Sequence, residues 1–317
     1  MSDRFSALQR TEADRTAGST PPSAEFVRGL ARSVRATHAV RALLAAVAGT
    51  ALAAVFVLPT ATATPVALAR SPAGGGSRQR WHPPAQLRWY WQLQGRLRAP
   101  AWAQALDLDG FDTTATEVAR LHRAGRRVIC YIDVGTWESW RADAKRFPRS
   151  LLGRPNGWPG ERWLDIRALG ELAPIMAARL RMCARKGFDA VEADNIDGYA
   201  NDTGFPLTAT EQLRYDLWIA REAHRVGLAI FQKNDLGQVR ALEPHFDGAL
   251  DEQCNFFSEC ALLAPYVKAH KPVLDAEYDR ALYPGFCAAD ARAGIMGALF
   301  DVALDGRFYR PCWAPPR

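Results

Sequence analysis

The sequence predicts an α/β protein built as a single (β/α)8 TIM barrel. Short apolar or aromatic runs alternate with amphipathic stretches through residues 81–317. Several amphipathic stretches end at a glycine that precedes the next apolar run, which is the order expected of βαβ units and a parallel sheet. About eight such units in about 235 residues match this barrel. A doubly wound sheet is the alternative, but no G-x-G-x-x-G pattern follows the first run.

Nine runs are expected to form strands, and three amphipathic stretches are expected to form helices. The strands are residues 88–93, 105–108, 127–134, 162–166, 188–194, 228–233, 248–252, 272–278 and 294–300. The helices are residues 114–124, 169–186 and 210–226, which end at Gly125, Gly187 and Gly227. Thr208 and Glu211 have the spacing of a capping box for the third helix.

The net charge of +6 comes entirely from the N-terminal part of the chain. Residues 1–80 contain ten Arg, no Lys and four acidic residues, whereas residues 81–317 are neutral. A protein that binds nucleic acid needs a basic face on its folded domain. The charge pattern therefore argues against a nucleic-acid partner, although binding through the tail remains a remote alternative.

A targeting segment follows the basic region of residues 1–41. Residues 42–58 are uncharged and apolar, and small residues follow up to residue 63. Such a pattern indicates a signal peptide, but the run is also long enough for a membrane anchor. Residues 64–80 are rich in Pro, Gly and Arg and read as a linker. Both interpretations place residues 81–317 outside the cytoplasm, with membrane contact only through the N-terminal segment.

The six cysteines suggest disulfides in an exported protein. Cys254 with Cys260 would close a short loop, and Cys287 with Cys312 would tie down the C-terminus. Cys130 lies in an apolar strand, where a buried free thiol is the simplest expectation. The sequence leaves the pairing of Cys130 and Cys183 open. No metal site is expected, because there is no CxxC motif and the six His lack ligand spacing.

Acidic residues follow the predicted strands in turn. In a (β/α)8 barrel the carboxyl ends of the strands form one rim, and catalytic groups project there. Some of these acids are expected to cap the following helices instead. The candidates for binding substrate are Asp107, Asp109, Asp133, Asp165, Asp197 and Asp235.

Aromatic residues at the same positions suit a carbohydrate ligand, because aromatic faces stack on sugar rings. Trp91, Tyr131, Trp163, Tyr199 and Tyr278 are the aromatic candidates. Glycoside hydrolysis needs two carboxylates that flank the scissile bond. Asp194 and Glu252 end separate predicted strands and are the predicted pair. Lys233 would pair with Asp194 and hold it ionised, although an ordinary structural ion pair is an equal alternative.

Several blocks between residues 88 and 280 resemble glycoside hydrolase family 114, the endo-α-1,4-polygalactosaminidases. The most specific are Gly157-Trp-Pro-Gly-Glu-Arg-Trp-Leu-Asp-Ile-Arg167 and Glu192-Ala-Asp-Asn-Ile-Asp-Gly-Tyr199. Others are Lys233-Asn-Asp235 and Glu252-Gln-Cys254. Ala193 replaces a Pro that often precedes the Asp in this family, and the stretch from Asp133 to Thr136 also differs, which leaves fine substrate preference open.

The resemblance implies a (β/α)8 barrel that cleaves α-1,4-linked galactosamine polymer internally, by retention and without a cofactor. It makes Asp194 the nucleophile and Glu252 the acid/base. A partly deacetylated polymer is cationic, and an acidic rim would attract it. The protein is expected to be a monomer. The alternatives are a hydrolase of another α-linked polysaccharide and a non-catalytic carbohydrate-binding barrel.

Overall fold

The computed structural model describes residues 80–313 of the chain. The predicted basic region, the signal or anchor segment at residues 42–63 and nearly all of the predicted linker lie outside the described residues. Within residues 80–313, no helix has both the length and the apolar character needed to cross a bilayer.

Eight parallel strands form one curled sheet in the order in which they occur along the chain, and a short antiparallel strand is added at one edge. The parallel strands are β1 (Trp89–Gln92), β2 (Ala105–Asp109), β3 (Arg127–Asp133), β7 (Ala190–Asp194), β8 (Ala229–Lys233), β9 (Gly248–Glu252), β10 (Val273–Glu277) and β11 (Met296–Phe300). The ninth strand is β12 (Tyr309–Pro311). The predicted α/β class and parallel barrel are confirmed.

The two edges of this sheet meet through single hydrogen bonds. Within residues 80–313, no backbone ladder pairs β1 with β11 or β12. Instead, the Trp89 indole donates to Met296 O at 2.8 Å, and the Tyr309 hydroxyl donates to Trp89 O at 2.7 Å. Leu93 N and Gln94 N also donate to Leu304 O, so side-chain bonds and two backbone bonds complete the barrel where the ladder stops.

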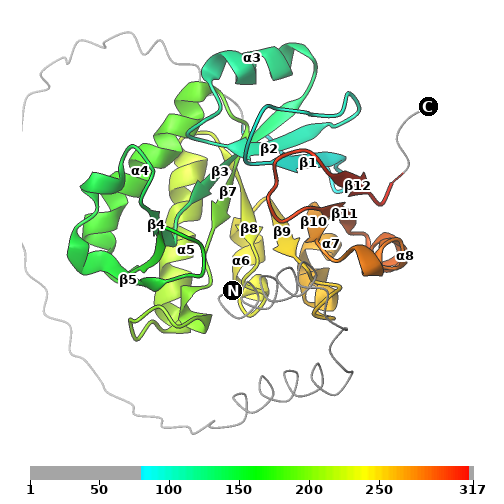
Figure 1. Ribbon diagram of the computed structural model, residues 1–317. Helices are drawn as coiled ribbons and strands as arrows, with labels where there is room; N and C mark the ends of the chain where they lie inside the picture. The colour runs from blue at the N-terminus through cyan, green and yellow to red at the C-terminus, as the bar shows by residue number, and fades with distance from the viewer. Residues whose placement is uncertain (1–79, 314–317) are drawn as a thin grey trace, which may run out of the picture. The chain divides into compact units, whose positions relative to one another are not determined.

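Helices cover the outer side of the sheet unevenly. They are α3 (Ala115–Arg123), α4 (Leu169–Lys186), α5 (Ala209–Arg225), α6 (Val239–Leu242), α7 (Ala264–Lys268) and α8 (Gly285–Ala293). Short 3-10 turns lie at Ala144–Arg146, Arg149–Leu151, Gly198–Ala200, Glu243–His245, Cys260–Leu263 and Arg280–Leu282. Helices α3, α4 and α5 pack side by side, and α8 covers β11 (Figure 1).

The helix ends follow the predicted signals. Thr208 and Glu211 form the reciprocal capping box of α5. Gly187 ends α4 with a φ of 93°, a left-handed conformation that glycine adopts without steric cost. The three predicted helices agree with α3, α4 and α5 to within one residue at each end.

One predicted barrel strand belongs elsewhere. The run at residues 162–166 forms part of β6 (Glu161–Leu164), which pairs antiparallel with β4 (Thr136–Glu138) and β5 (Leu152–Pro155). These three strands form a separate small sheet between β3 and α4. The alternating pattern of a strand carries no information about its partner. The prediction that this run is a barrel strand is therefore wrong.

The parallel strands bury apolar side chains on both faces. An inner cluster fills the barrel with Trp89, Ala190, Phe231 and Leu250 among its members, and an outer cluster packs under the helices. Successive side chains of a strand point to opposite faces. Position along a strand therefore decides whether a polar side chain enters the barrel or the layer beneath the helices.

The described chain contains three disulfides. Cys254–Cys260 and Cys287–Cys312 confirm the two predicted pairs. The pairing that the sequence leaves open is also a disulfide: Cys130 on β3 is bonded to Cys183 on α4, which excludes the alternative of a free thiol. Both residues are fully buried, and the strand and the helix that packs over it bring together positions 53 residues apart.

Candidate active site

Four charged side chains enter the barrel at the carboxyl ends of three adjacent strands. Glu192 and Asp194 belong to β7, Lys233 to β8 and Glu252 to β9. Each is separated by an even number of residues from an inner apolar residue of its strand, such as Phe231 on β8. The period of two therefore places all four side chains on the inner face.

Lys233 occupies the centre of this group. Its Nζ lies 2.7 Å from Glu192 Oε1, 3.3 Å from Asp194 Oδ1 and 3.5 Å from Glu252 Oε2. The ammonium also lies 4.6 Å from the centre of the Trp91 ring, in a cation–π contact. The side chain of Lys233 is only 2% exposed, so its charge is compensated by these neighbours rather than by water.

The position of Lys233 limits how far apart Asp194 and Glu252 are. Both carboxylates have an oxygen within 3.5 Å of one Nζ atom. These two oxygens are therefore separated by at most about 7 Å, a range that includes the spacing of carboxylate pairs that flank one glycosidic bond. Both carboxylates consequently face one common space.

Neighbouring polar side chains orient Asp194. The Tyr131 hydroxyl donates to Asp194 Oδ2 at 2.8 Å. Asn195 donates its backbone N–H to Asp194 Oδ1 at 2.9 Å. The Asn195 amide also donates to Asp194 Oδ2 at 3.2 Å and to Asp133 Oδ2 at 2.7 Å. Asp194 is thus held on both oxygens, and Asp133 takes part through Asn195.

Glu252 is held from both neighbouring strands. The Tyr278 hydroxyl donates to Glu252 Oε1 at 2.5 Å, and the Asn234 amide donates to Glu252 Oε2 at 3.3 Å. Asn234 Oδ1 also accepts the backbone N–H of Glu252 at 2.9 Å. This pattern fixes both the backbone and the carboxylate of Glu252.

The backbone turns sharply after each of these three strands. Asn195, Asn234 and Gln253, which directly follow Asp194, Lys233 and Glu252, have φ values of 60°, 48° and 69°. Positive φ is uncommon outside glycine, although Asn tolerates it best. Strained residues of this kind cluster at functional sites, where surrounding contacts hold them in place.

Burial and Lys233 oppose each other in setting the charges. Burial raises the pKa of Asp194, against the lowering effect of Lys233. For Glu252 the lowering contacts with Lys233, Tyr278 and Asn234 outweigh burial, so its pKa falls below the usual value. Burial would lower the pKa of Lys233, but Asp194, Glu192 and Glu252 raise it well above its usual value. In the free site the proton therefore favours Asp194 over Glu252, while Lys233 stays charged.

Several other predicted residues join this group. Trp91 lies under Lys233, and Tyr131 and Tyr278 contact the two carboxylates. Asp107 is 1% exposed, and burial, followed by the charge of Glu192, raises its pKa well above the usual value. These side chains form a continuous polar layer above the apolar filling of the barrel.

A second acidic group lies beyond β7 and β8. The Tyr199 hydroxyl donates to Asp235 Oδ1 at 3.0 Å. Burial, followed by the charge of Asp197, raises the pKa of Asp235 to about 8. Asp216 on α5 is fully buried, and burial, followed by Asp235, raises its pKa well above the usual value.

The remaining predicted residues have structural partners instead. Asp109 forms an ion pair with Arg141 at 2.7 Å, and Asp165 forms one with Arg167 at 2.7 Å. Asp133 accepts the backbone N–H groups of Gly135 and Thr136. Trp163 is 1% exposed within the small sheet. None of Asp109, Asp165 and Trp163 has a hydrogen bond or ion pair with Asp194 or Glu252 among the described residues.

Sequence reasoning did not select Glu192, Asn195 and Asn234 as site residues. The alternation of β7 contained the signal for Glu192, because it lies two positions before Asp194 on the same face. Asn195 and Asn234 have positions in the turns that only the three-dimensional register reveals. Their side chains reach the carboxylates because the backbone reverses immediately after the strand.

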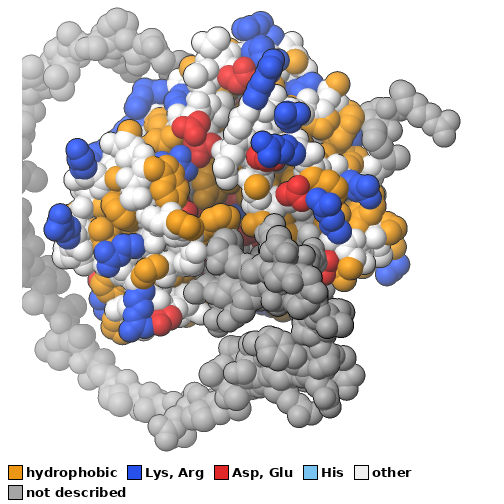
Figure 2. Space-filling view, viewed as in Figure 1, with side chains coloured by type: hydrophobic (Ala, Val, Ile, Leu, Met, Phe, Trp, Pro, Cys, Tyr) orange, Lys and Arg blue, Asp and Glu red, His pale blue; other side chains and the backbone are white. Residues whose placement is uncertain are grey.

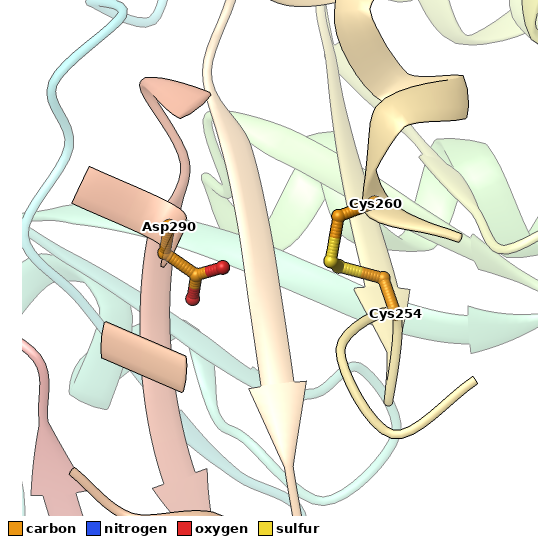
Figure 3. A group of neighbouring side chains, drawn as sticks. All are labelled: Cys254, Cys260 and Asp290. Atoms are coloured by element: carbon orange, nitrogen blue, oxygen red, sulfur yellow. A yellow bond between two sulfur atoms is a disulfide. The ribbon is translucent and has the colours of Figure 1, made fainter. Parts of the chain in front are cut away.

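Two groups of residues have their ligand-type atoms close together on the outer side of the sheet. One contains Cys254, Cys260 and Asp290, and the other contains Asp251, Cys254 and Asp275. Figure 3 shows the Cys254–Cys260 bond with the Asp290 carboxylate facing it across a strand. A disulfide sulfur is not a thiolate, and only the thiolate is a metal ligand. The sulfur atoms therefore do not qualify as ligands in this state.

The surface charges are dispersed over the face shown in Figure 2. Lys and Arg side chains alternate there with acidic, apolar and uncharged ones and form no continuous patch.

A parallel α/β barrel with two carboxylates facing one space at the strand ends defines a class of enzyme, the glycoside hydrolases. The chain belongs to glycoside hydrolase family GH114, because the family model matches residues 71–312.

Solved structures agree with this membership. The crystal structure of Aspergillus fumigatus Ega3 in complex with galactosamine is 30% identical, with a TM-score of 0.70 over 75% of this chain and 100% of that one. The glycoside hydrolase domain of PelA from Pseudomonas aeruginosa is 16% identical, with a TM-score of 0.55 over 70% of this chain and 97% of that one. At this identity the likeness to PelA concerns the fold alone. No curated protein matches the chain.

Proposed function

We propose that this enzyme cleaves α-1,4-linked galactosamine-containing polysaccharide internally, with Asp194 and Glu252 as its two catalytic carboxylates. The observation that carries the proposal is the shared contact of both carboxylates with Lys233, which keeps them within reach of one linkage. The likeness to Ega3, which was crystallised with galactosamine, supports the choice of sugar.

In the proposed reaction Asp194 attacks the anomeric carbon, and Glu252 gives its proton to the leaving glycosidic oxygen. A covalent glycosyl–enzyme forms as the glycosidic bond breaks. Glu252 then takes a proton from water, and the resulting hydroxide replaces Asp194 with net retention. Lys233 stays protonated throughout and stabilises the carboxylates during both steps.

The proposed roles require a proton on Glu252 and none on Asp194 when the reaction begins. In the free site the proton favours Asp194, whereas attack by Asp194 requires it on Glu252. Interacting carboxylates titrate as a group, so a change in one neighbour redistributes the proton. We infer that substrate binding moves this proton, because a cationic sugar near Asp194 stabilises its ionised form.

The substrate class follows from the charge of the site. Asp107, Asp197 and Asp235 place further carboxyl groups around the catalytic group. Burial raises the pKa of Asp107 and Asp235, and a nearby cation would favour their ionised, negative form. A partly deacetylated galactosamine polymer carries ammonium groups that would compensate this charge. Asp107, Asp197, Asp235 and Tyr199 are the proposed subsite residues.

The proposed location is outside the cytoplasm, either in solution or attached to the cell membrane through residues 42–58. Three disulfides in the described domain support this location, since such bonds persist in oxidising compartments. The proposed oligomeric state is a monomer.

Mass spectrometry of the products from partly deacetylated galactosaminogalactan tests the activity. The wild type should release oligosaccharides, while Asp194→Asn and Glu252→Gln should each lose at least about a thousandfold in turnover and still bind polymer. Asp165→Asn is the matched control, because Asp165 pairs with Arg167 away from the catalytic group. Release from a different α-linked polysaccharide, or unchanged behaviour of Glu252→Gln, would contradict the proposal.

Azide separates the roles of the two carboxylates. With an activated aryl oligogalactosaminide, Glu252→Ala should be rescued by azide and give a glycosyl azide of retained configuration. Asp194→Gly should give the inverted azide, because azide then replaces the missing nucleophile. The opposite pair of products would exchange the two roles.

A further inference from the structure

We propose that Asn255 is a positioning residue for Glu252, acting through a group of buried carboxyls on the outer face of β10 and on α8. This inference rests on the proposed function, because it assumes that Glu252 is catalytic. We call Asp275, Glu277 and Asp290 the outer carboxyl group.

The turn that follows Glu252 is held almost entirely by β10. The N–H of Gln253 donates to Ala276 O at 2.9 Å, and the N–H of Cys254 contacts Asp275 Oδ1 at 3.4 Å. The next two N–H groups, of Asn255 and Phe256, donate to Glu277 Oε1 at 2.8 and 3.3 Å. Four consecutive amides thus depend on one strand, and two carboxyls of that strand accept three of them.

The side chain of Asn255 joins this turn to a third carboxyl. Its amide donates to Asp275 Oδ2 at 3.1 Å and to Asp290 Oδ1 at 2.7 Å. Asp290 belongs to α8, and it reaches the sheet only because position 297 is a glycine. A Cβ atom there would lie 1.9 Å from Asp290 Oδ2. Gly297 and Asp275 are register partners on β11 and β10, so the contact is built into three elements.

Both the carboxylate of Glu252 and the turn that follows this residue therefore depend on β10 and on the residue after it. Tyr278, the residue after this strand, binds the carboxylate of Glu252 from inside the barrel, while Asp275 and Glu277 hold the turn from outside. Gln253 begins the turn with a φ of 69°, a conformation that a non-glycine residue keeps only under outside constraint. Loss of the outer contacts frees this turn and with it the backbone of Glu252.

Burial shifts the titration of the outer carboxyl group towards neutral pH. Burial, followed by the charges of Glu277, Asp290 and Asp251, raises the pKa of Asp275 well above the usual value. Burial raises the pKa of Glu277 to about 7 and that of Asp290 to about 6.

The charged groups that face this cluster are all acidic. They are Asp251 from β9, Asp275 and Glu277 from β10, Asp279 after β10 and Asp290 from α8. In the described residues, no ion pair joins a Lys, Arg or His to Asp275, Glu277 or Asp290. As pH rises, these carboxyls lose protons. Each ionised carboxylate accepts the N–H groups of the turn more strongly, but no cation offsets the growing repulsion within the group, and we expect that repulsion to push its members apart and loosen the turn.

Kinetics of Asn255 and Asp290 variants across pH 4 to 9 test the proposal, with the polymer assay above. Asn255→Ala should lower kcat by about 10- to 100-fold and change KM little, since a small misplacement of a catalytic group affects turnover more than binding. Asn255→Asp adds a carboxyl that keeps a donor only while protonated, so it should approach wild-type kcat near pH 5 and lose activity near pH 8.

Asp290→Asn provides a second test that preserves size and hydrogen bonding. It removes one titrating group, so the alkaline decline of kcat should move to higher pH. Leu121→Ala is the control for lost stability alone: this buried residue of α3 should lower the melting temperature and leave the pH profile of kcat unchanged.

An Asn255→Ala enzyme within twofold of wild-type kcat would overturn the inference. So would identical pH profiles for wild type, Asn255→Asp and Asp290→Asn, which remain informative if Asn255→Ala does not fold. Glu252→Gln, measured alongside, separates the two proposals. Its full activity would remove the proposed function, whereas an inactive Glu252→Gln with a normal Asn255→Ala would remove only the positioning role.

Discussion

The inner and outer faces of the same strands carry carboxyls in opposite electrostatic settings. On the inner face, Glu192, Asp194 and Glu252 surround one ammonium, that of Lys233. On the outer face, Asp275, Glu277 and Asp290 share the neutral amide and backbone of Asn255. Five of the six side chains are buried and that of Glu252 is only 17% exposed, so the main difference between the groups is the compensating charge rather than contact with water.

This difference shows how the surroundings of a buried carboxyl set its charge. Lys233 lowers the pKa of Glu252 and partly offsets the effect of burial on Asp194 and Glu192, whereas no cation offsets burial in the outer carboxyl group. Isolated buried charge is costly, and a group without a cation neutralises instead. The inner group is suited to reaction chemistry, and the outer one to holding backbone.

Removing the inner cation should have the largest effect. Lys233→Met leaves three buried carboxylates without compensation, so we expect kcat/KM to fall by about a thousandfold or more and the unfolding free energy to fall by about 3–5 kcal/mol. Turnover of polymer and urea unfolding measure the two effects.

Lys271→Met is the matched control for that change. Lys271 forms its ion pair with Glu243 at 2.8 Å, is 25% exposed, and has no contact with the catalytic carboxylates. A similar loss of turnover in both variants would mean that the inner group has no special dependence on its cation.

Removing a neutral donor from the inner group should have an intermediate effect. Tyr278→Phe deletes the hydroxyl that donates to Glu252, and kcat should fall about tenfold, as expected for a hydrogen bond to a charged group. The hydroxyl lowers the pKa of Glu252, and Glu252 must hold a proton to act as the acid, so the alkaline limb of the kcat profile should move to higher pH. Tyr266→Phe, which loses a bond to Gln232 on the outer face, should leave this limb in place.

The smallest effect is expected for stability on the outer face. Asp290 has a pKa of about 6 when folded, above that of an unfolded Asp, so the folded state binds more protons between pH 4 and 6. Stability should therefore fall as pH rises through this window, by about 3 kcal/mol at most from this group. Asp290→Asn should flatten that slope in urea unfolding measured from pH 4 to 8, and an unchanged slope would contradict the assignment.

Much of the fold could be predicted because the signals are local. The capping box at Thr208 and the left-handed Gly187 depend on a few neighbouring residues, and both are present as expected. The acids at the strand ends were also visible, because strand alternation and barrel topology place them on one rim.

The errors and omissions concern long-range partners. Residues 162–166 have the composition of a strand, but only pairing with β4 and β5 shows that they leave the barrel. The bond of Cys130 to Cys183 depends on how α4 packs over β3. The predicted contact of Lys233 with Asp194 is present, yet its equal reach to Glu252 follows from the register of three strands.

The chain segment that forms the small antiparallel sheet begins and ends at neighbouring points beside the barrel. The N–H of Leu164, at the end of β6, donates to Gly135 O, just before β4, at 3.0 Å. An excursion whose two ends touch can change in length with little change to the strands that support it, provided that its ion pairs with the barrel and α4 are kept, such as Arg141 with Asp109 and Arg179 with Glu138. Residues 136–164 are therefore a suitable segment to exchange between GH114 enzymes, which would give chimeras that keep the barrel scaffold.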